Sequence, residues 1–580
     1  MIQARFYVLM GTLCIMLLLA VAEGSTVSAA AGDCQSEIMQ ARKPRPSGAM
    51  NQDGTYTAFD YAGKPDPSST IFACVNDQFL STDVPVQVEN GVSLIPMRAL
   101  LEALGAELDW DGDSRTVKVN LHGTSVVLQV DRTEALVNGH SVKLDVPARM
   151  KDGRVLIPTR FISEQLGSAV SWQPERKAIL IYKPLQAEVS AQAVAAATLN
   201  TDDYRYGNYF STAKRFLLNR KNQVVLVEDE GSELRVQEFT PAFDKTGERT
   251  VLMELPLLGG VHLGEDGHYY VLYGQSNMEE SAEKKVYTIV QYDEAWKKIG
   301  QTDIRDVYVS QPFHAGNVTM DSHNGTLAVY STRLRYLTPD DGLRHQSNIT
   351  FLVDMKSMRL LYDGGQWPRN YVSHSFATYV RFDGDKIVYA DHGDGYPRSI
   401  SLQVEQQDEI VSKLDILRFP GKIGDNYTGA HLGGLEVAKD AYLVAGSSVS
   451  LTEQYGNSET KNVYLGVIPK GATDDSQVKV VWMTDHAVES GVNIKETHLI
   501  KLSDNKFVLL WEESGDNGGL FYTVVDGSGR QLRGPSSLHG VPSPGHIDPL
   551  VSGDHILWYA HDRSSSEEQG PAILYKLHIQ

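Results

Sequence analysis

A block of thirty residues occurs twice in the first third of the chain, and this repeat constrains the fold of that region most strongly. The copies span residues 90–119 and 152–181, at a constant offset of 62 positions. Matching residues are Gly91/Gly153, Leu94/Leu156, Ile95/Ile157, Pro96/Pro158, Arg98/Arg160, Glu102/Glu164, Leu104/Leu166, Gly105/Gly167 and Trp110/Trp172. The chain therefore builds the same structural unit twice.

Each copy is predicted to form a strand–strand–helix–strand–strand unit. The dipeptides Asn90-Gly91 and Asp152-Gly153 are typical of tight hairpin turns. A proline then stands where each helix begins, and a glycine stands where each helix ends. Two such units packed together predict one α+β domain over residues 84–183. The repeated Arg98 and Arg160 are interpreted as partners of Glu102 and Glu164 one helical turn on, and an anion site is the alternative.

The segments LIPMRALLEALGAELDW (94–110) and LIPTRFISEQLGSAVSW (156–172) resemble the copper amine oxidase-like N-terminal domain of secreted proteins from Gram-positive bacteria. In the enzymes that gave this family its name, the domain is a stalk remote from the chemistry. The resemblance therefore implies a spacer or surface-presentation role for this part of the chain.

The catalytic residues of a copper amine oxidase are not found in this sequence. Those enzymes need an Asn-Tyr-Asp/Glu motif and a His-x-His pair, and imidazole is a suitable ligand for copper. The three Asn-Tyr pairs, which begin at positions 208, 370 and 426, continue with Phe210, Val372 and Thr428, and the 17 histidines contain no His-x-His pair. The sequence predicts a protein that is not a copper amine oxidase and is more simply a non-enzyme.

The N-terminus is typical of an exported protein. Residues 1–31 combine Arg5, a long apolar run and a small-residue cleavage site, which predicts a signal peptide; an uncleaved anchor helix is the alternative. Residues 32–83 have little periodicity and form a predicted irregular segment. Cys34 and Cys74 are the cysteines left after cleavage, and an oxidising compartment favours a disulfide between them, although two free thiols remain an alternative. We therefore expect an extracellular or cell-surface protein that has no membrane contact after cleavage.

The charge balance limits the partners of the chain. The formal net charge of −20 argues against a nucleic-acid partner, because phosphate binding requires clustered lysine and arginine. The partners that remain are extracellular or cell-wall carbohydrate, peptide or protein.

Residues 184–200 are rich in Ala and Gln and are predicted to form a linker.

Beyond them, residues 201–580 change to short strands separated by polar turns. Seven hairpins recur, at 214–230, 260–274, 316–332, 378–391, 434–448, 497–513 and 549–562. This spacing predicts an all-β propeller, with seven blades preferred and six or eight as alternatives. Residues 202–210 are expected to supply the strand that closes the ring, and an array of β-sandwiches is the other fold considered.

Five histidines precede hairpin turns, and most of them share strand parity. They are His314, His374, His431, His498 and His546. If the first strands of the hairpins line a central channel, these side chains ring its mouth, where propellers bind ligands. The sequence predicts no cofactor. A divalent metal bound in the channel by these histidines is the only cofactor considered as an alternative. The structural alternative, that they satisfy backbone groups at strand ends, is favoured by their uneven offsets.

The segment 391–398 is the other candidate site. His392, Asp394 and Arg398 bring an imidazole, a carboxylate and a guanidinium together, next to glycines that let the backbone approach a ligand. A plain polar turn explains the segment equally well.

Two functions compete. The first is a secreted or cell-surface binding protein in which the stalk-like domain presents a ligand-binding propeller. The second is an extracellular propeller enzyme, a lyase or hydrolase of polymers, with a site of His and Asp in the channel. The first is preferred because no complete catalytic set occurs.

Overall fold

The computed structural model describes residues 48–50, 56–58 and 70–579, with gaps in the last range. The gaps are 76–77, 122–123, 174–176, 183–186, 195–211, 222, 367–368, 425–426, 450–459, 488–489, 516–517, 539, 546, 554 and 562–571. The predicted signal peptide and Cys34 lie outside the described residues. Within these ranges no helix has the length and apolar character needed to cross a membrane.

Both repeat copies fold in the predicted order of elements. The first copy comprises β5 (Gln87–Glu89), β6 (Val92–Pro96), α2 (Met97–Leu104), β7 (Glu107–Asp111) and β8 (Thr116–Leu121). The second comprises β12 (Arg149–Lys151), β13 (Arg154–Pro158), α3 (Thr159–Gln165), β14 (Ala169–Gln173) and β15 (Ala178–Tyr182). Pro96 and Pro158 cap the two helices, and Gly105 ends the first helix at a φ of 78°. Such a left-handed conformation suits glycine because it has no Cβ.

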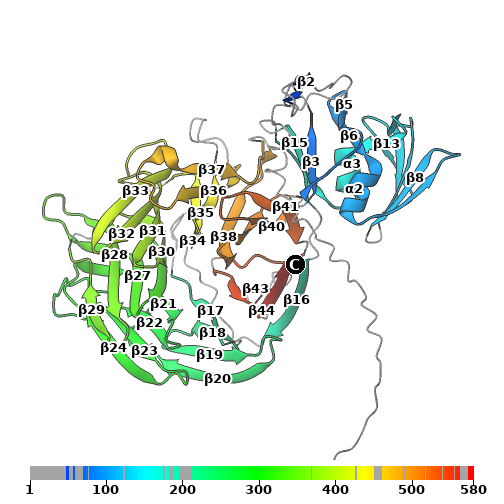
Figure 1. Ribbon diagram of the computed structural model, residues 1–580. Coiled ribbons are helices and arrows are strands. Elements are labelled where there is room, and N and C mark those ends of the chain that lie inside the picture. Colours follow the sequence, from blue (N-terminus) through cyan, green and yellow to red (C-terminus); the bar gives the residue numbers. More distant parts are fainter. Residues whose placement is uncertain are drawn as a thin grey trace, which may run out of the picture.

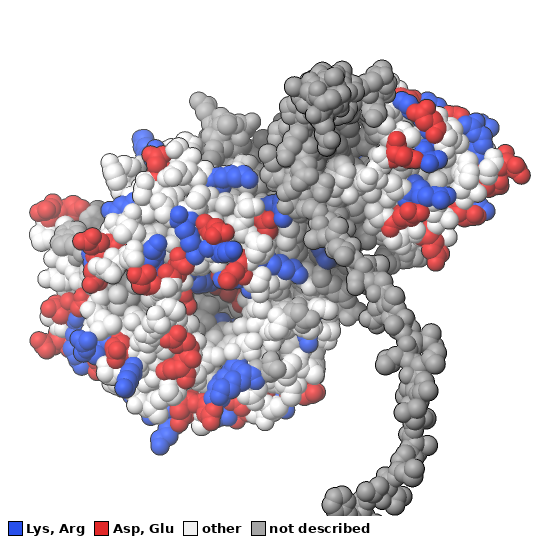
Figure 2. All heavy atoms as spheres, in the orientation of Figure 1, with Lys and Arg blue, Asp and Glu red and all other residues white. Residues whose placement is uncertain are grey.

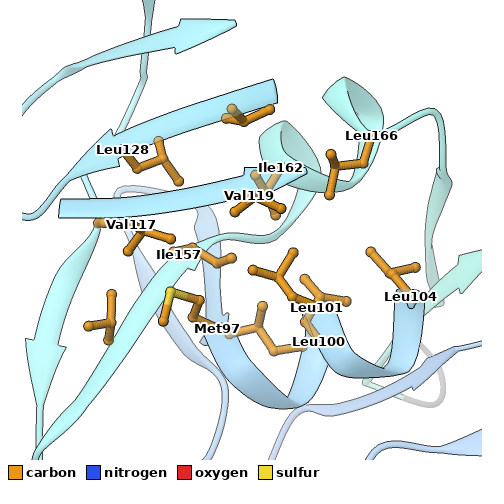
Figure 3. Packing of buried hydrophobic residues seen from close by; sticks show 14 of the residues in the cluster. Met97, Leu100, Leu101, Leu104, Val117, Val119, Leu128, Ile157, Ile162 and Leu166 are labelled. Carbon is orange, nitrogen blue, oxygen red and sulfur yellow. The ribbon is translucent and has the colours of Figure 1, made fainter. Parts of the chain in front are cut away.

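The repeat copies pack into one core, and additional strands extend it. Strands β6 and β13 pair with each other, so the two copies share a sheet. Leu100, Leu101 and Leu104 of α2 face Val119 and Ile157, and all five are buried (Figure 3). Beyond the prediction, β9 (Thr124–Gln129), β10 (Glu134–Val137) and β11 (His140–Lys143) continue the sheet that contains β7 and β8.

The domain also begins earlier than residue 84. Strand β3 (Phe72–Val75) runs parallel to β15 and pairs with β4 (Gln78–Phe79), inside the span predicted to be irregular. These strands are short, and their apolar side chains complete an existing sheet, so local periodicity did not reveal them. Cys74 on β3 is 1% exposed and disulfide-bonded. The predicted partner, Cys34, falls among the residues that are not described.

The remainder of the described chain is all-β. Its sheets are antiparallel, and within each sheet consecutive strands pair along the chain, except that β25 and β26 both pair with β27. They are β17 (Arg215–Arg220) to β20 (Lys245–Leu252), β21 (Leu257–Leu263) to β24 (Lys298–Ile304), β25 (Val309–Pro312) to β29 (Arg359–Tyr362), β30 (Ser375–Asp383) to β33 (Glu409–Arg418), β34 (Ala430–Val437) to β37 (Lys479–Trp482), β38 (Ile494–Ser503) to β41 (Gln531–Leu538), and a last sheet with β42 (Leu550–Ser552), β43 (His555–His561) and β44 (Ala572–Ile579). All seven predicted hairpins are confirmed as paired strands.

The strand that completes the last sheet is β16 (Ala187–Val194), which pairs with β44 along its whole length. The prediction of a linker at 184–200 was wrong over these residues, and the closing strand was expected instead at 202–210. β16 lies at the outer edge of its sheet, where small side chains are enough to cover the neighbouring strand. Its sequence alternates small apolar residues with more polar ones, at Ala187, Val189, Ala191 and Ala193. The Ala-rich composition obscured this period of two.

Each sheet has one innermost strand, which is the first strand of the sheet for β17, β21, β30, β34 and β38 and is β42 in the last sheet, and neighbouring innermost strands contact one another. β26 (Val318–His323) takes this position in its sheet. The contacts run from β17 through β21, β26, β30, β34 and β38 to β42, and β42 returns to contact β17. Figure 1 shows these sheets side by side around a common centre, with the repeat domain next to β41. Side chains far apart in the sequence therefore meet at this centre.

Candidate central-channel site

The innermost strands enclose a cavity of about 230 Å³. Its lining comes from β17, β21, β26, β30, β34 and β38 and from the segment just before β42. Each of these strands contributes between two and four residues to the lining. Around the cavity, the face in Figure 2 carries acidic and basic side chains that are interspersed rather than gathered by sign.

Polar side chains converge on the cavity from separate strands. Tyr379 and Arg381 lie two residues apart on β30, and Glu496 and His498 lie two apart on β38. Asp548 joins them from the segment before β42. This clustering has the character of a ligand site, because a few placed polar groups in a concave surface fix the orientation of a bound molecule.

Two imidazole–carboxylate pairs face the cavity. His431 Nε2 lies 3.7 Å from Glu496 Oε2, and His498 Nδ1 lies 3.5 Å from Asp548 Oδ1. His498 Nε2 lies 2.9 Å from the Gly545 carbonyl oxygen. Because a carbonyl only accepts, His498 donates a proton from Nε2 to Gly545, which leaves Nδ1 facing Asp548.

Arg381 is held in its charged form deep in the channel. Its Nη2 lies 3.1 Å from Glu436 Oε1. Burial opposes the charge, but Glu436 and Asp321 outweigh that effect and raise the pKa of Arg381. Burial, together with the charge of Asp548, raises the pKa of Tyr379 well above its usual value, so its phenol remains a hydrogen-bond donor.

Two threonine hydroxyls at the cavity wall, Thr319 Oγ1 and Thr497 Oγ1, are buried without a hydrogen-bond partner among the described residues. His498 Nδ1 also makes no hydrogen bond there, and its contact is the 3.5 Å ion pair with Asp548. Thr497 is 1% exposed and His498 is 5% exposed. Buried polar groups in native proteins almost always have a partner, so these atoms indicate where a polar ligand would bind.

The structure brings most of the predicted histidines to one end of the innermost strands. His374 immediately precedes β30, His431 is the second residue of β34, and His314 lies four residues before β26. Of the predicted histidines, His431 and His498 line the cavity. His546 lies outside the described residues.

His374 and His392 are buried next to the cavity lining. His374 Nδ1 lies 3.3 Å from Asp394 Oδ1, and His392 Nε2 lies 2.7 Å from Thr428 Oγ1. Burial, and after it the charge of His431, lowers the pKa of His392 well below its ordinary value. Burial and His374 likewise lower the pKa of His314. The imidazoles of His314 and His392 are therefore neutral near pH 7.

Arg398 holds backbone rather than facing the cavity. Its guanidinium donates to the carbonyl oxygens of Pro420 at 3.0 Å, Asp394 at 3.2 Å and Tyr427 at 2.6 Å. These bonds fix the loop after β31 (Lys386–Gly393) against the loop before β34. The segment 391–398 thus supports the channel mouth through its structure.

Asp391 joins two neighbouring sheets from a fully buried position. Its Oδ1 accepts hydrogen bonds from Tyr330 OH at 2.8 Å, Asn348 Nδ2 at 3.0 Å and Ser375 Oγ at 2.7 Å. Burial raises the pKa of Asp391 to about 7, against the lowering effect of these donors. Because Tyr330 and Asn348 belong to the preceding sheet, this network links that sheet to the one containing β30.

Among the residues that the structure describes, no group of three or more His, Cys, Asp or Glu side chains is placed to hold a metal ion.

Several of the polar residues that line the cavity were not predicted from the sequence. These are Tyr379, Arg381, Glu496, Thr497 and Asp548. A usable signal was present in some hairpins, because their first strand places polar or charged residues at alternate positions, as at Tyr379 and Arg381 and at Glu496 and His498. Polar residues inside a buried strand indicate a face that meets a channel rather than the core.

The fold and the cavity define a two-part protein: a repeated α+β domain joined to a larger all-β region with a polar central site. Residues 74–181 match the family model of the copper amine oxidase N-terminal domain, and this part of the chain is such a domain. The primary amine oxidase of Klebsiella aerogenes is 28% identical over 108 residues, which cover 18% of this chain and 14% of that enzyme. The match thus spans about one seventh of the enzyme's length.

Solved structures align with parts of this chain at low structural similarity. The N-terminal domain of Nup159 gives a TM-score of 0.34 at 11% identity and covers 67% of this chain and 96% of that one. The quinohemoprotein alcohol dehydrogenase from Comamonas testosteroni gives 0.35 at 10% identity, over 80% of this chain and 73% of that one. A protein of unknown function from Dyadobacter fermentans gives 0.34 at 11% identity, over 67% and 99%. Overlaps this weak support no conclusion about function.

Proposed function

We propose that this chain is a ligand-binding protein whose large domain is a seven-bladed β-propeller that takes a small polar ligand in its central channel. Support for seven blades comes from the closed series of contacts between innermost strands, from β17 to β42 and back to β17. Under this proposal the copper amine oxidase N-terminal domain presents the propeller at the cell surface or in the extracellular space.

The observation that carries the proposal is the set of buried polar atoms at the cavity wall that make no hydrogen bond among the described residues, Thr319 Oγ1, Thr497 Oγ1 and His498 Nδ1. Thr497 Oγ1 and His498 Nδ1 stand beside Glu496 and Tyr379, which add an acceptor and a donor. The cavity of about 230 Å³ is smaller than the ~300–1,000 Å³ of pockets for drug-sized molecules. It therefore fits one sugar unit or one amino-acid residue, which is the scale of an end or branch of an extracellular polymer.

A ligand screen with matched variants tests this. N-acetylglucosamine, glucose, galacturonate and glycylglycine are titrated into the full chain by calorimetry. We expect at least one to bind, and Glu496→Gln to weaken binding at least tenfold, because the cavity loses a charged acceptor. Glu512→Gln is the control, since Glu512 lies on β39 (Lys506–Glu513) of the same sheet, pairs with Lys495 at 3.0 Å and does not line the cavity. Absence of binding, or equal effects of both variants, overturns the proposal.

A second function, cleavage of an extracellular polymer by a hydrolase or a lyase, is favoured by the two imidazole–carboxylate pairs. His431 with Glu496 and His498 with Asp548 face one cavity, and such pairs can move a proton to or from a bound substrate. Product release from polygalacturonate and from cell-wall glycan, compared between the wild type and His498→Asn, tests it. Turnover that the variant abolishes while binding persists supports the enzyme; no turnover by the wild type removes it.

A further inference from the structure

A second groove lies on the copper amine oxidase N-terminal domain, away from the channel. Its volume is about 500 Å³, within the range of ~300–1,000 Å³ for ligand pockets. One wall comes from the β5–β6 hairpin of the first repeat copy, and the other from α3 and β14 of the second. The groove is thus built where the two copies meet.

The groove is lined by aromatic and aliphatic surface that differs between the repeat copies. Trp172 is 43% exposed and lines the groove with Phe161, whereas its counterpart Trp110 packs against the core of the domain. The position equivalent to Phe161 in the first copy is Ala99. Phe161 packs against the core of the domain on one side, whereas the exposed Trp172 is not among the residues packed against that core, so the second copy presents an apolar surface at the groove.

Charged side chains of both signs stand at the same groove. Lys143, Asp145, Arg160 and Glu164 all line it and are exposed. Arg160 Nε and Glu164 Oε1 are 3.9 Å apart with side chains 66% and 53% exposed, so this pair is loose and free to form other hydrogen bonds. Two cations and two anions give no net charge, which favours an uncharged ligand rich in donors and acceptors.

We infer that this groove binds a neutral oligosaccharide. A sugar ring offers an apolar face that stacks on Trp172 and hydroxyl groups that bond to Arg160 and Glu164 at the edge. A charged glycan is disfavoured because each charge at the groove is matched by an opposite one. The N-terminal domain would then be a second glycan contact as well as a spacer. This inference does not depend on the ligand of the channel.

Calorimetric titration of the full chain with cellohexaose and chitohexaose tests it, with oligogalacturonate as the charged comparison. We expect one neutral hexasaccharide to bind and Trp172→Ala to weaken that binding at least tenfold, while Trp172→Phe retains most of it. Trp482→Ala is the matched control, because Trp482 is also 43% exposed but lies on β37, outside the groove. Glu496→Gln should leave this binding unchanged, which separates the groove from the channel.

Three outcomes overturn the inference. The first is no binding of either neutral hexasaccharide, and the second is binding that Trp172→Ala does not weaken. The third is a change of oligomeric state by Trp172→Ala without glycan binding, which would assign the groove to a second copy of the chain. None of these outcomes bears on the ligand screen of the channel.

Discussion

Gly433 and Thr497 bring two innermost strands into backbone contact beside the cavity. A Cβ on Gly433 would lie well inside 3.0 Å of the Thr497 carbonyl oxygen, closer than real carbon atoms approach. Gly433 sits at an irregularity of β34, between Leu432 and Gly434, and its neighbour His431 lines the cavity. The convergence of β34 and β38 that forms the site thus requires glycine at this position.

The first prediction is that Gly433→Ala destabilises the large domain. The opposing atom is backbone and cannot rotate away, so the strands must separate, at a cost of about 1–3 kcal/mol in the free energy of unfolding. The midpoint of urea unfolding, followed by tryptophan fluorescence, measures this. Gly112→Ala is the control, because its nearest neighbour would be 3.7 Å from the new carbon. Equal midpoints for the two variants would mean that the strands are not in contact as described.

The second prediction concerns the pH dependence of stability through Asp391. Its pKa is about 7 in the folded protein, against 3.8 for an unperturbed aspartate. The folded state therefore holds an extra proton between these values, and this contribution to stability, complete below pH 4, is lost as the pH rises to 7. Asp391→Asn keeps an acceptor oxygen for Tyr330, Asn348 and Ser375 but does not titrate.

We expect the unfolding free energy of the wild type to fall relative to Asp391→Asn by about 2 kcal/mol between pH 5 and pH 8. Urea unfolding of both proteins at the two values measures this difference. Parallel behaviour of the wild type and the variant across this window would show that Asp391 is ionised throughout.

The third prediction tests β16 as part of the last sheet. Val189 is partly buried and packs against the apolar cluster of that sheet, whereas its neighbour Ser190 is exposed. Val189→Asp should therefore lower the free energy of unfolding by about 1–3 kcal/mol, because it places a charge against apolar side chains. Ser190→Asp, the matched control, should change it by less than about 0.5 kcal/mol. The same small change for both would leave β16 without a role in closing the sheet.

Much of the fold could be predicted because its signals are local. The repeat is visible because the two copies match at a constant offset. The turn dipeptides Asn90-Gly91 and Asp152-Gly153 and the apolar second strands of the hairpins are signals that extend over only a few residues. The strands that were missed depend on partners distant in the sequence. β3 is stabilised by β15, about a hundred positions later, and β16 by β44 at the far end of the chain.

The sequence predicted where the site lies but not which side chains line it. Strand parity indicated that histidines would gather at one end of the innermost strands, and the structure places His374 just before β30 and His431 at the second residue of β34. Whether a side chain then faces the cavity or the core depends on local irregularities, such as the one at Leu432 and Gly434. Arg398 shows the same limit, since its engagement with three carbonyls depends on loops that no periodicity describes.

A crystal structure of the full chain soaked with the tightest ligand of the channel screen tests the central claim most directly. The account predicts ligand atoms within hydrogen-bond distance of Thr497 Oγ1 and His498 Nδ1 on β38 and of the Tyr379 hydroxyl on β30, more than a hundred residues earlier in the sequence. A ligand bound elsewhere, with only ordered water in the channel at saturation, would contradict it.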